Sequence, residues 1–255
     1  MKVAMNSMDI AWENKRVNSE WCQKSVAEAA ENQADVILFP EMTLTGFSMQ
    51  VNKIQDKDGE SVRFFSELAK EYNIAIGFGY VTKNGEKGRN HFCLVNRKGK
   101  VLEDYEKIHP FSYGGESSAY EGGERICHAR LEDLTCGLFI CYDLRFPEAF
   151  QQLPMDTDAV FIIANWPKER LAHWYTLLMA RAIEMQCYVV GVNRTGAGGG
   201  LEYRKSSIAI APEGIPVPTE QKECNRYVEL SKEARRSYVK GFPTRKDRRP
   251  DIYRA

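Results

Sequence analysis

Residues 138–148, LFICYDLRFPE, form the stretch around which the chain is organised. Its first three apolar residues predict the end of a buried strand, Cys141 and the polar residues after it predict a turn, and Pro147 is typical of the first position of a helix. A thiol between the end of a strand and the start of a helix is easily exposed and polarised, as a nucleophile must be. Free cysteines are among the most buried residue types, so Cys141 alone would be interpreted as a core residue.

Apolar runs and helical spacing elsewhere predict alternating strands and helices. Strands are expected at residues 3–8, 34–39, 74–81, 90–96, 100–105, 125–129, 134–140, 159–164, 187–192, 206–211 and 226–230, and helices at 17–32, 61–72, 147–152, 171–185 and 231–239. Residues 83–85 are expected to form a turn, residues 112–124 a loop, and the Gly-rich residues 196–200 a flexible rim. No change in composition and no repeat divides the chain. We therefore expect one α/β domain with two packed sheets and helices outside.

The composition is that of an ordinary globular protein and narrows the class of function. The 255 residues contain 35 Lys+Arg and 35 Asp+Glu, and this balance argues against a nucleic-acid-binding protein. The seven cysteines include no C-x-x-C pair, which predicts neither a disulfide framework nor a metal site and favours a reducing cytoplasm. We expect no signal peptide and no membrane association, because no apolar run approaches the roughly 18 residues that a membrane span requires.

Three reactive side chains follow the ends of predicted apolar strands: Glu41, Lys107 and Cys141. Functional groups converge at strand ends in layered α/β folds. A carboxylate beside a thiol accepts its proton, and a nearby ammonium stabilises the thiolate and later an oxyanion. The spacing alone leaves two other interpretations open, in which Glu41 is a turn residue and Lys107 a surface lysine.

Seven blocks stand out in order along the chain. They are FPEMTLTGF at 39–47, YEKIHPF at 105–111, ICYDLRFPE at 140–148, ANWP at 164–167, ARAIE at 180–184, GVNR at 191–194 and DRRPDIY at 247–253. Together they resemble the nitrilase superfamily of carbon–nitrogen hydrolases, and ANWP followed by His173 and Trp174 is most similar to the omega-amidase branch. The resemblance implies one carbon–nitrogen hydrolase domain over residues 1–255, folded as a four-layer α-β-β-α sandwich and assembled as a homodimer.

The resemblance also implies a Glu-Lys-Cys catalytic triad without a cofactor. Glu41 matches the general base, Lys107 the lysine that stabilises the transition state, and Cys141 the nucleophile, with the peptide N–H of Tyr142 as a second donor to the oxyanion. Glu116 lies where many members of the family have a second active-site glutamate. Because the loop around it lacks a strong motif, Glu121 remains an alternative.

Arg145, four residues after the nucleophile, is the candidate for choosing the substrate. Its guanidinium can bind a carboxylate through two parallel hydrogen bonds, and Trp166 can form an aromatic wall beside it. The resemblance to omega-amidases suggests small keto-acid amides such as 2-oxoglutaramate or 2-oxosuccinamate. The alternative is a structural salt bridge from Arg145 to Glu148 or Asp143, because buried arginines are normally paired.

The leading hypothesis is therefore an amidase that releases ammonia from a small amide. Alternatives within the same chemistry are an N-carbamoyl-amine hydrolase and a nitrilase, and the alternative outside enzymes is a binding protein on the same fold. A papain-like pairing of Cys141 with His109 is disfavoured, because Pro110 follows this histidine and Glu41 is available as a base.

Overall fold

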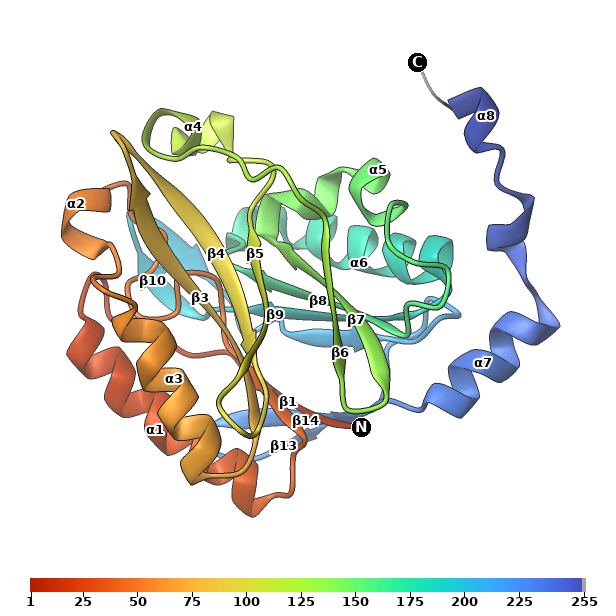
Figure 1. Cartoon of the computed structure of the whole chain (residues 1–255), viewed down its shortest axis with the longest axis horizontal. Coiled ribbons are helices and arrows are strands. Elements are labelled where there is room, and N and C mark those ends of the chain that lie inside the picture. The colour runs from red at the N-terminus through yellow and green to blue at the C-terminus, as the bar shows by residue number, and fades with distance from the viewer. Residues whose placement is uncertain (254–255) are drawn as a thin grey trace.

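Two β-sheets packed face to face form the centre of the protein, and helices cover the outer face of each sheet (Figure 1). This computed structural model describes residues 1–253. The four layers confirm the expected α-β-β-α sandwich within a single domain.

The first sheet has seven strands and carries two long helices. In spatial order the strands are β13 (Glu220–Gln221), β14 (Asn225–Glu229), β1 (Lys2–Asn6), β2 (Val36–Leu38), β3 (Ala75–Asn84), β4 (Lys87–Val95) and β5 (Val101–Glu106). Helices α1 (Lys15–Glu31) and α3 (Glu60–Glu71) pack on its outer face, where Phe65 of α3 stacks on Phe78 of β3 with ring centroids 4.1 Å apart. The strands β1, β2 and β3 run parallel, so the ends of β2 and β3 point to one edge of the sheet.

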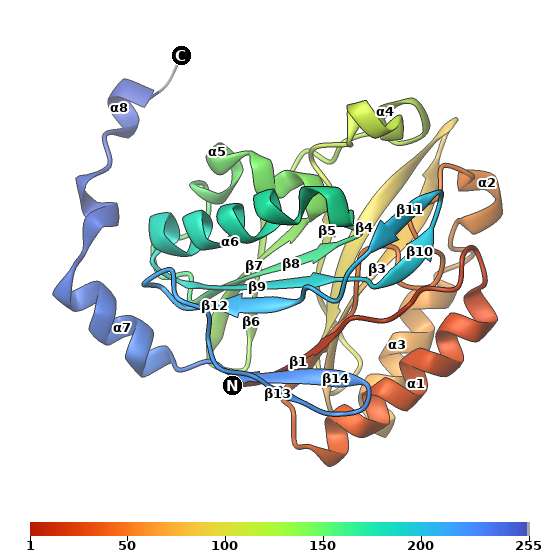
Figure 2. The ribbon, with the colours of Figure 1, turned by 180° about the vertical axis from the view of Figure 1, so that it is seen from behind.

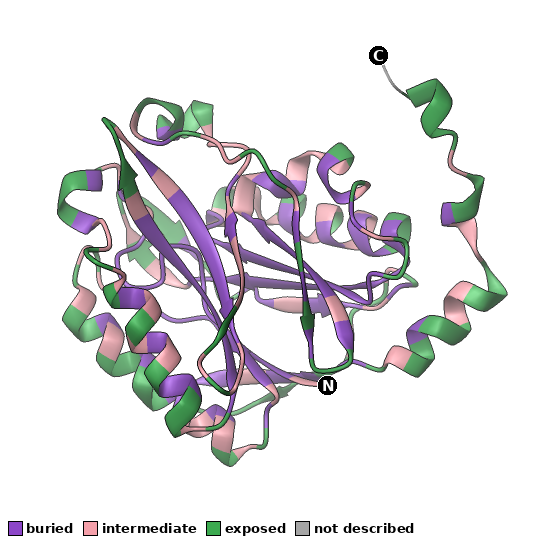
Figure 3. Cartoon of the chain, in the orientation of Figure 1, coloured by how far each residue is buried: buried purple, intermediate pink, exposed green. Residues whose placement is uncertain are grey.

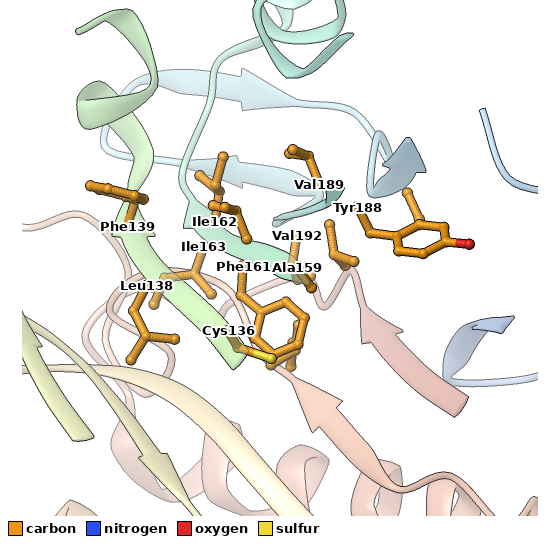
Figure 4. Packing of buried hydrophobic residues seen from close by; sticks show 14 of the residues in the cluster. Cys136, Leu138, Phe139, Ala159, Phe161, Ile162, Ile163, Tyr188, Val189 and Val192 are labelled. Carbon is orange, nitrogen blue, oxygen red and sulfur yellow. The ribbon is translucent and has the colours of Figure 1, made fainter. Parts of the chain in front are cut away.

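The second sheet has five strands and delivers the chain to Cys141. In spatial order these are β12 (Ile208–Ile210), β9 (Tyr188–Asn193), β8 (Ala159–Ala164), β7 (Leu134–Ile140) and β6 (Cys127–Leu131). Helices α5 (Pro147–Phe150) and α6 (Leu171–Met185) cover its outer face. Side chains alternate along β7 and β8, so Phe139 and Ile162 point toward these helices, whereas Leu138 and Phe161 point toward the first sheet (Figure 4).

The central core lies between the sheets, where the strands are almost entirely buried (Figure 3). Strands β7 and β8 have apolar side chains on both faces, which explains their near-continuous apolar sequences. Since both sheets are fixed by this core, the loops that leave their strand ends begin from rigid positions.

Short elements complete the chain around this frame. They are α2 (Val51–Ile54), η1 (Ser112–Gly114), α4 (Glu116–Ala119), η2 (Cys141–Arg145), η3 (Lys168–Arg170), β10 (Gly196–Gly198), β11 (Leu201–Tyr203), α7 (Lys232–Gly241), η4 (Thr244–Asp247) and α8 (Pro250–Tyr253). The hairpin β10–β11 lies beyond the ends of β8 and β9 (Figure 2), and α7, η4 and α8 lead away from the sheets.

Three local predictions differ from the structure. The predicted turn at 83–85 is partly wrong, because β3 continues to Asn84 and pairs with β4 as a long hairpin. The predicted loop at 112–124 contains two short helical segments, η1 and α4. The Gly-rich residues 196–200 form most of the β10–β11 hairpin. The end of the expected domain, residues 254–255, lies outside the described residues, and no helix among residues 1–253 is long and apolar enough to cross a membrane.

Candidate active site

Four strand ends bring the candidate residues together. Glu41 follows β2, Lys107 follows β5, Cys141 follows β7, and Asn165 follows β8. The first two strands belong to one sheet and the last two to the other. The site therefore depends on the packing of the two sheets against each other.

A buried ion cluster forms the floor of the site. The Lys107 Nζ donates hydrogen bonds to Glu41 Oε1 at 2.9 Å and to Glu116 Oε2 at 2.8 Å. Asn90 lies on β4 and bridges the same two carboxylates, since its Nδ2 is 2.8 Å from Glu41 Oε1 and 3.1 Å from Glu116 Oε1. All three charged side chains are at most 1% exposed. Such charges are tolerated in the interior only when they are paired and hydrogen-bonded, as they are here.

The second oxygen of Glu41 is held by the residue that follows β8. Glu41 Oε2 accepts a hydrogen bond of 2.9 Å from the peptide N–H of Asn165. The same N–H favours the thiolate of Cys141 by a backbone hydrogen bond. The Asn165 backbone therefore acts on both the carboxylate of Glu41 and the thiol of Cys141. The Asn165 side chain locks this arrangement, because its Nδ2 donates to the Glu41 carbonyl at 2.6 Å.

The charges around the thiol decide its protonation state. Burial raises the pKa of Cys141 well above its ordinary value, and the negative charge of Glu41 raises it further. Burial lowers the pKa of Lys107, but the charges of Glu116 and Glu41 outweigh this, and the net pKa lies well above the ordinary value. Burial also raises the pKa of Glu116, against the opposing effect of Lys107. The resting site thus holds a charged lysine and a neutral thiol, and the thiol needs a base before it can attack.

A buried aspartate holds the turn that presents the nucleophile. Cys141 has a φ of 46°, a left-handed conformation that is unusual for a residue other than glycine. Asp143 Oδ2 accepts hydrogen bonds from the Ile140 N–H at 3.0 Å and the Tyr105 hydroxyl at 2.8 Å. Asp143 Oδ1 accepts the His109 N–H at 3.0 Å. These contacts tie the turn to the end of β7 and to residues 105–109, and they explain how the strained residue is maintained.

Glycine is required where the loop carrying Glu41 crosses β3. A Cβ at Gly79 would lie 2.4 Å from the backbone nitrogen of Met42 and 3.0 Å from the Cα of Glu41. The close approach allows two hydrogen bonds between Thr43 and this strand. The Thr43 N–H donates to the Gly79 carbonyl at 3.0 Å, and the Thr43 Oγ1 accepts from the Gly79 N–H at 2.9 Å. Gly79 therefore sets the position of the Glu41 backbone.

A pocket opens above Cys141. It is lined by Phe47, Lys107, Phe111, Cys141, Tyr142, Arg145, Asn165, Trp166, Pro167, Arg170, Leu201 and Tyr203. The Arg145 guanidinium lies over the Trp166 ring, 4.8 Å from its centroid, and 5.8 Å from that of Tyr142. Trp166 is anchored on both sides, because its Nε1 donates to the Arg170 carbonyl at 2.8 Å and its N–H to Asn193 Oδ1 at 2.7 Å.

The structure brings the predicted site residues together. Glu41, Lys107 and Glu116 share the buried cluster, and Cys141, Tyr142, Arg145 and Trp166 line the pocket with Lys107.

The structure does not support the alternative roles considered for Glu121, Arg145 and His109. Glu121 points elsewhere and pairs with Arg89 at 3.0 Å. Arg145 forms no ion pair with Asp143 or Glu148 or with any other acidic residue among 1–253; its Nη2 lies 3.3 Å from Nδ1 of His173, and Asp143 is engaged by Tyr105 and His109. The His109 imidazole bonds Asp143, with its Nδ1 2.8 Å from Oδ1, so it is part of the support beneath the turn.

Sequence reasoning missed four residues that organise the site: Asn90, Tyr105, Asp143 and Asn165. Asn165 lies in the ANWP block, and Tyr105 and Asp143 lie in the YEKIHPF and ICYDLRFPE blocks, so the motifs contained a signal for them. Asn90 is one polar residue at the start of a predicted strand, and nothing near it in the sequence indicates its partners.

The fold and the site define a hydrolase of the four-layer α-β-β-α class. The family model for carbon-nitrogen hydrolase matches residues 2–238, and the chain belongs to this family.

Several named relatives are similar to the chain over most of their length. The chain is 37% identical over 217 residues to omega-amidase YafV of Escherichia coli (strain K12), covering 84% of each chain. It is 33% identical over 192 residues to 2-oxoglutaramate amidase of Bacillus subtilis (strain 168), covering 73% of this chain and 74% of the relative. Among solved structures, the CN-hydrolase superfamily protein XC1258 of Xanthomonas campestris superposes with a TM-score of 0.90 at 27% identity, covering 98% of this chain and 97% of the other. The chain thus acts on carbon–nitrogen bonds.

Proposed function

We propose that this protein is an omega-amidase that hydrolyses small keto-acid amides such as 2-oxoglutaramate through a thioester on Cys141. One observation carries the proposal: the Glu41–Lys107–Glu116 cluster lies beneath a pocket that contains Cys141 and also Arg145, which has no acidic partner within residues 1–253. The similarity to proteins named omega-amidase and 2-oxoglutaramate amidase supports the substrate class.

The first half-reaction forms the thioester. Glu41 accepts the thiol proton as the Cys141 sulfur attacks the amide carbonyl carbon. The oxyanion receives hydrogen bonds from Lys107 and from the peptide N–H of Tyr142. In the resting site the ammonium contacts one oxygen of Glu41 and both oxygens of Glu116, so one of these hydrogen bonds gives way when Lys107 donates to the oxyanion. The Glu41 carboxylic acid then protonates the nitrogen, the C–N bond breaks, and ammonia leaves.

The second half-reaction consumes water. Glu41 removes a proton from a water molecule, and the hydroxide attacks the thioester carbonyl carbon. The C–S bond breaks, the acid is released, and the thiolate recovers its proton from Glu41. Glu116 holds Lys107 in place throughout, with its own carboxylate fixed by the Phe111 N–H at 2.5 Å.

Arg145 provides the specificity in this proposal. Its guanidinium binds the carboxylate at the far end of the substrate, while Trp166 keeps it oriented. Replacement Arg145→Ala is expected to raise KM for 2-oxoglutaramate by about 10- to 100-fold, because a hydrogen-bonded charge pair contributes roughly 1.5–3 kcal/mol. KM for butyramide, which lacks a carboxylate, should change little. Equal effects on both amides would remove Arg145 from substrate selection.

The decisive experiment measures ammonia release from keto-acid amides, N-carbamoyl amines and nitriles by wild type and Cys141→Ala. We expect the wild type to prefer 2-oxoglutaramate and the variant to be inactive, with intact mass showing a transient acyl adduct only on the wild type. A preference for carbamoyl amines or nitriles would replace the proposal by one of those activities. Turnover by Cys141→Ala at the wild-type rate would overturn the mechanism.

We also propose that the enzyme acts as a cytoplasmic homodimer with its domain extending to residue 255. Support for the dimer comes from the family resemblance, and support for the compartment from seven cysteines, all of which are free. Light scattering coupled to size-exclusion chromatography tests the assembly, because a monomeric mass at micromolar concentration would contradict it. Fractionation of the source cells tests the compartment.

A further inference from the structure

A second cation lines the active-site pocket. Arg170 ends η3 just before α6, and its guanidinium lies over the Phe111 ring, 5.5 Å from the centroid. Among residues 1–253 it has no acidic partner within 4 Å, and its side chain donates no hydrogen bond. Arg170 is only partly exposed, so its charge is not simply solvated as on an open surface.

Two cations near the pocket but outside its lining have acidic partners. Lys168 pairs with Glu202 of β11, and the buried Arg181 of α6 pairs with Glu184 at 2.8 Å. Arg145 and Arg170, the two arginines that line the pocket, have no such partner among residues 1–253. The pocket therefore presents two positive charges that no acidic side chain among these residues pairs with, where a substrate must lie.

Both arginines contact the same tryptophan, Trp166. Arg145 lies over the face of Trp166, and the Nε1 of the same indole donates to the Arg170 carbonyl at 2.8 Å. The Arg170 N–H closes the turn by donating to the Pro167 carbonyl at 3.1 Å. Because backbone contacts fix this turn, the Arg170 side chain is not needed to hold the fold at this point. Its stacking on Phe111 keeps the guanidinium at the pocket wall.

We propose that Arg170 is a second substrate-binding cation, and that Arg145 and Arg170 together bind the carboxylate end of a 2-oxo acid amide. This inference rests on the proposed function and names a residue beyond Arg145. A 2-oxo acid presents three oxygen acceptors at one end, two on the carboxylate and one on the neighbouring carbonyl. One guanidinium satisfies a carboxylate with two parallel donors, and a second guanidinium supplies donors for the remaining lone pairs.

The test separates binding from catalysis. Calorimetric titration with 2-oxoglutarate, the product with the same end group, is performed on wild type, Arg170→Gln and Arg170→Met, the last of which keeps an aliphatic stem over Phe111. The control is Arg204→Gln, because Arg204 is exposed just after β11 and does not line the pocket. We expect Kd to rise about 10-fold or more in both Arg170 variants and to stay within about twofold in the control.

Kinetics provide the second readout. KM for 2-oxoglutaramate should rise by a similar factor in the Arg170 variants, while kcat/KM for butyramide stays at the wild-type level. Unchanged Kd in both variants, or equal losses for the two amides, would overturn the role of Arg170 while leaving the amidase intact. A wild type that binds 2-oxoglutarate through Arg170 but hydrolyses no amide would instead refute the proposed function.

Discussion

Asn90→Asp is the substitution that most directly tests the buried charge cluster. The side chain keeps its shape, but a donor becomes a carboxyl group placed 2.8 Å and 3.1 Å from oxygens of Glu41 and Glu116. A single ammonium, that of Lys107, would then face three carboxylates. We expect the new carboxyl group to take up a proton in the folded protein.

The size of the effect follows from comparing the repulsion between two carboxylates with the free energy needed to keep the new carboxyl group protonated. Two unit charges about 3 Å apart repel by about 5 kcal/mol at an effective dielectric constant of about 20. Keeping a carboxyl group of ordinary pKa about 3.9 protonated at pH 7 costs about 4 kcal/mol, so protonation is the cheaper outcome. The pKa of the new group is therefore raised by folding. Since the folded state then binds more protons than the unfolded state, stability falls as pH rises above about 4.

Urea denaturation at pH 5 and pH 7 measures this effect. Relative to wild type, Asn90→Asp should lose about 1.5 kcal/mol at pH 5 and about 4 kcal/mol at pH 7, a slope of about 1.4 kcal/mol per pH unit. Asn52→Asp is the control, because Asn52 is exposed on α2 and should give a change below about 1 kcal/mol. A loss for Asn90→Asp that is equal at the two pH values would refute the reasoning.

Three further substitutions test the support of the site. Asp143→Ala removes the acceptor of two peptide N–H groups and a hydroxyl. It should lower the free energy of unfolding by about 3 kcal/mol or more and reduce kcat. Urea denaturation and ammonia-release assays that match wild type would contradict this expectation. Gly79→Ala should destabilise the protein by about 1–3 kcal/mol in thermal unfolding, because the new Cβ clashes with the loop after β2. The control is Gly241→Ala, whose Cβ meets no neighbouring atom and which should be neutral or slightly stabilising. Glu41→Gln should abolish turnover and lower the pKa of Cys141, because the charge of Glu41 raises this pKa. Alkylation of Cys141 by iodoacetamide, followed by mass spectrometry, should therefore begin at a lower pH than in wild type. An unchanged pH profile would contradict the electrostatic effect of Glu41 on Cys141.

The positions of the candidate catalytic residues could be predicted because they depend on local patterns. An apolar run marks a strand, and its last residue marks the edge where loops begin, so Glu41, Lys107 and Cys141 were recognisable as strand-end residues. The same reasoning predicted two packed sheets from the number of strands. Strand boundaries were less accurate where β3 and β4 form a long hairpin, because partner strands extend each other beyond the point where the apolar pattern stops.

Residues that act through distant partners could not be predicted in this way. Asn90 bridges carboxylates that lie 49 and 26 positions away in the chain, and the Asn165 N–H reaches Glu41 across 124 positions. Glu116 was expected in a loop, yet it begins the short helix α4 and is held by Lys107 and the Phe111 N–H. Such contacts are selected by the packing of the two sheets, and no local propensity encodes them.

By itself, the sequence determined which chemical groups this protein has and at which strand ends they lie, because hydrophobic periodicity is a local property of the chain. Only the tertiary structure decided the protonation and the ion pairing of these groups. Burial and the charge of Glu41 keep Cys141 as a neutral thiol, and the absence of acidic partners among residues 1–253 leaves Arg145 and Arg170 available in the pocket. Both outcomes depend on desolvation and on distances between groups from different sheets and loops, and these exist only in the folded protein.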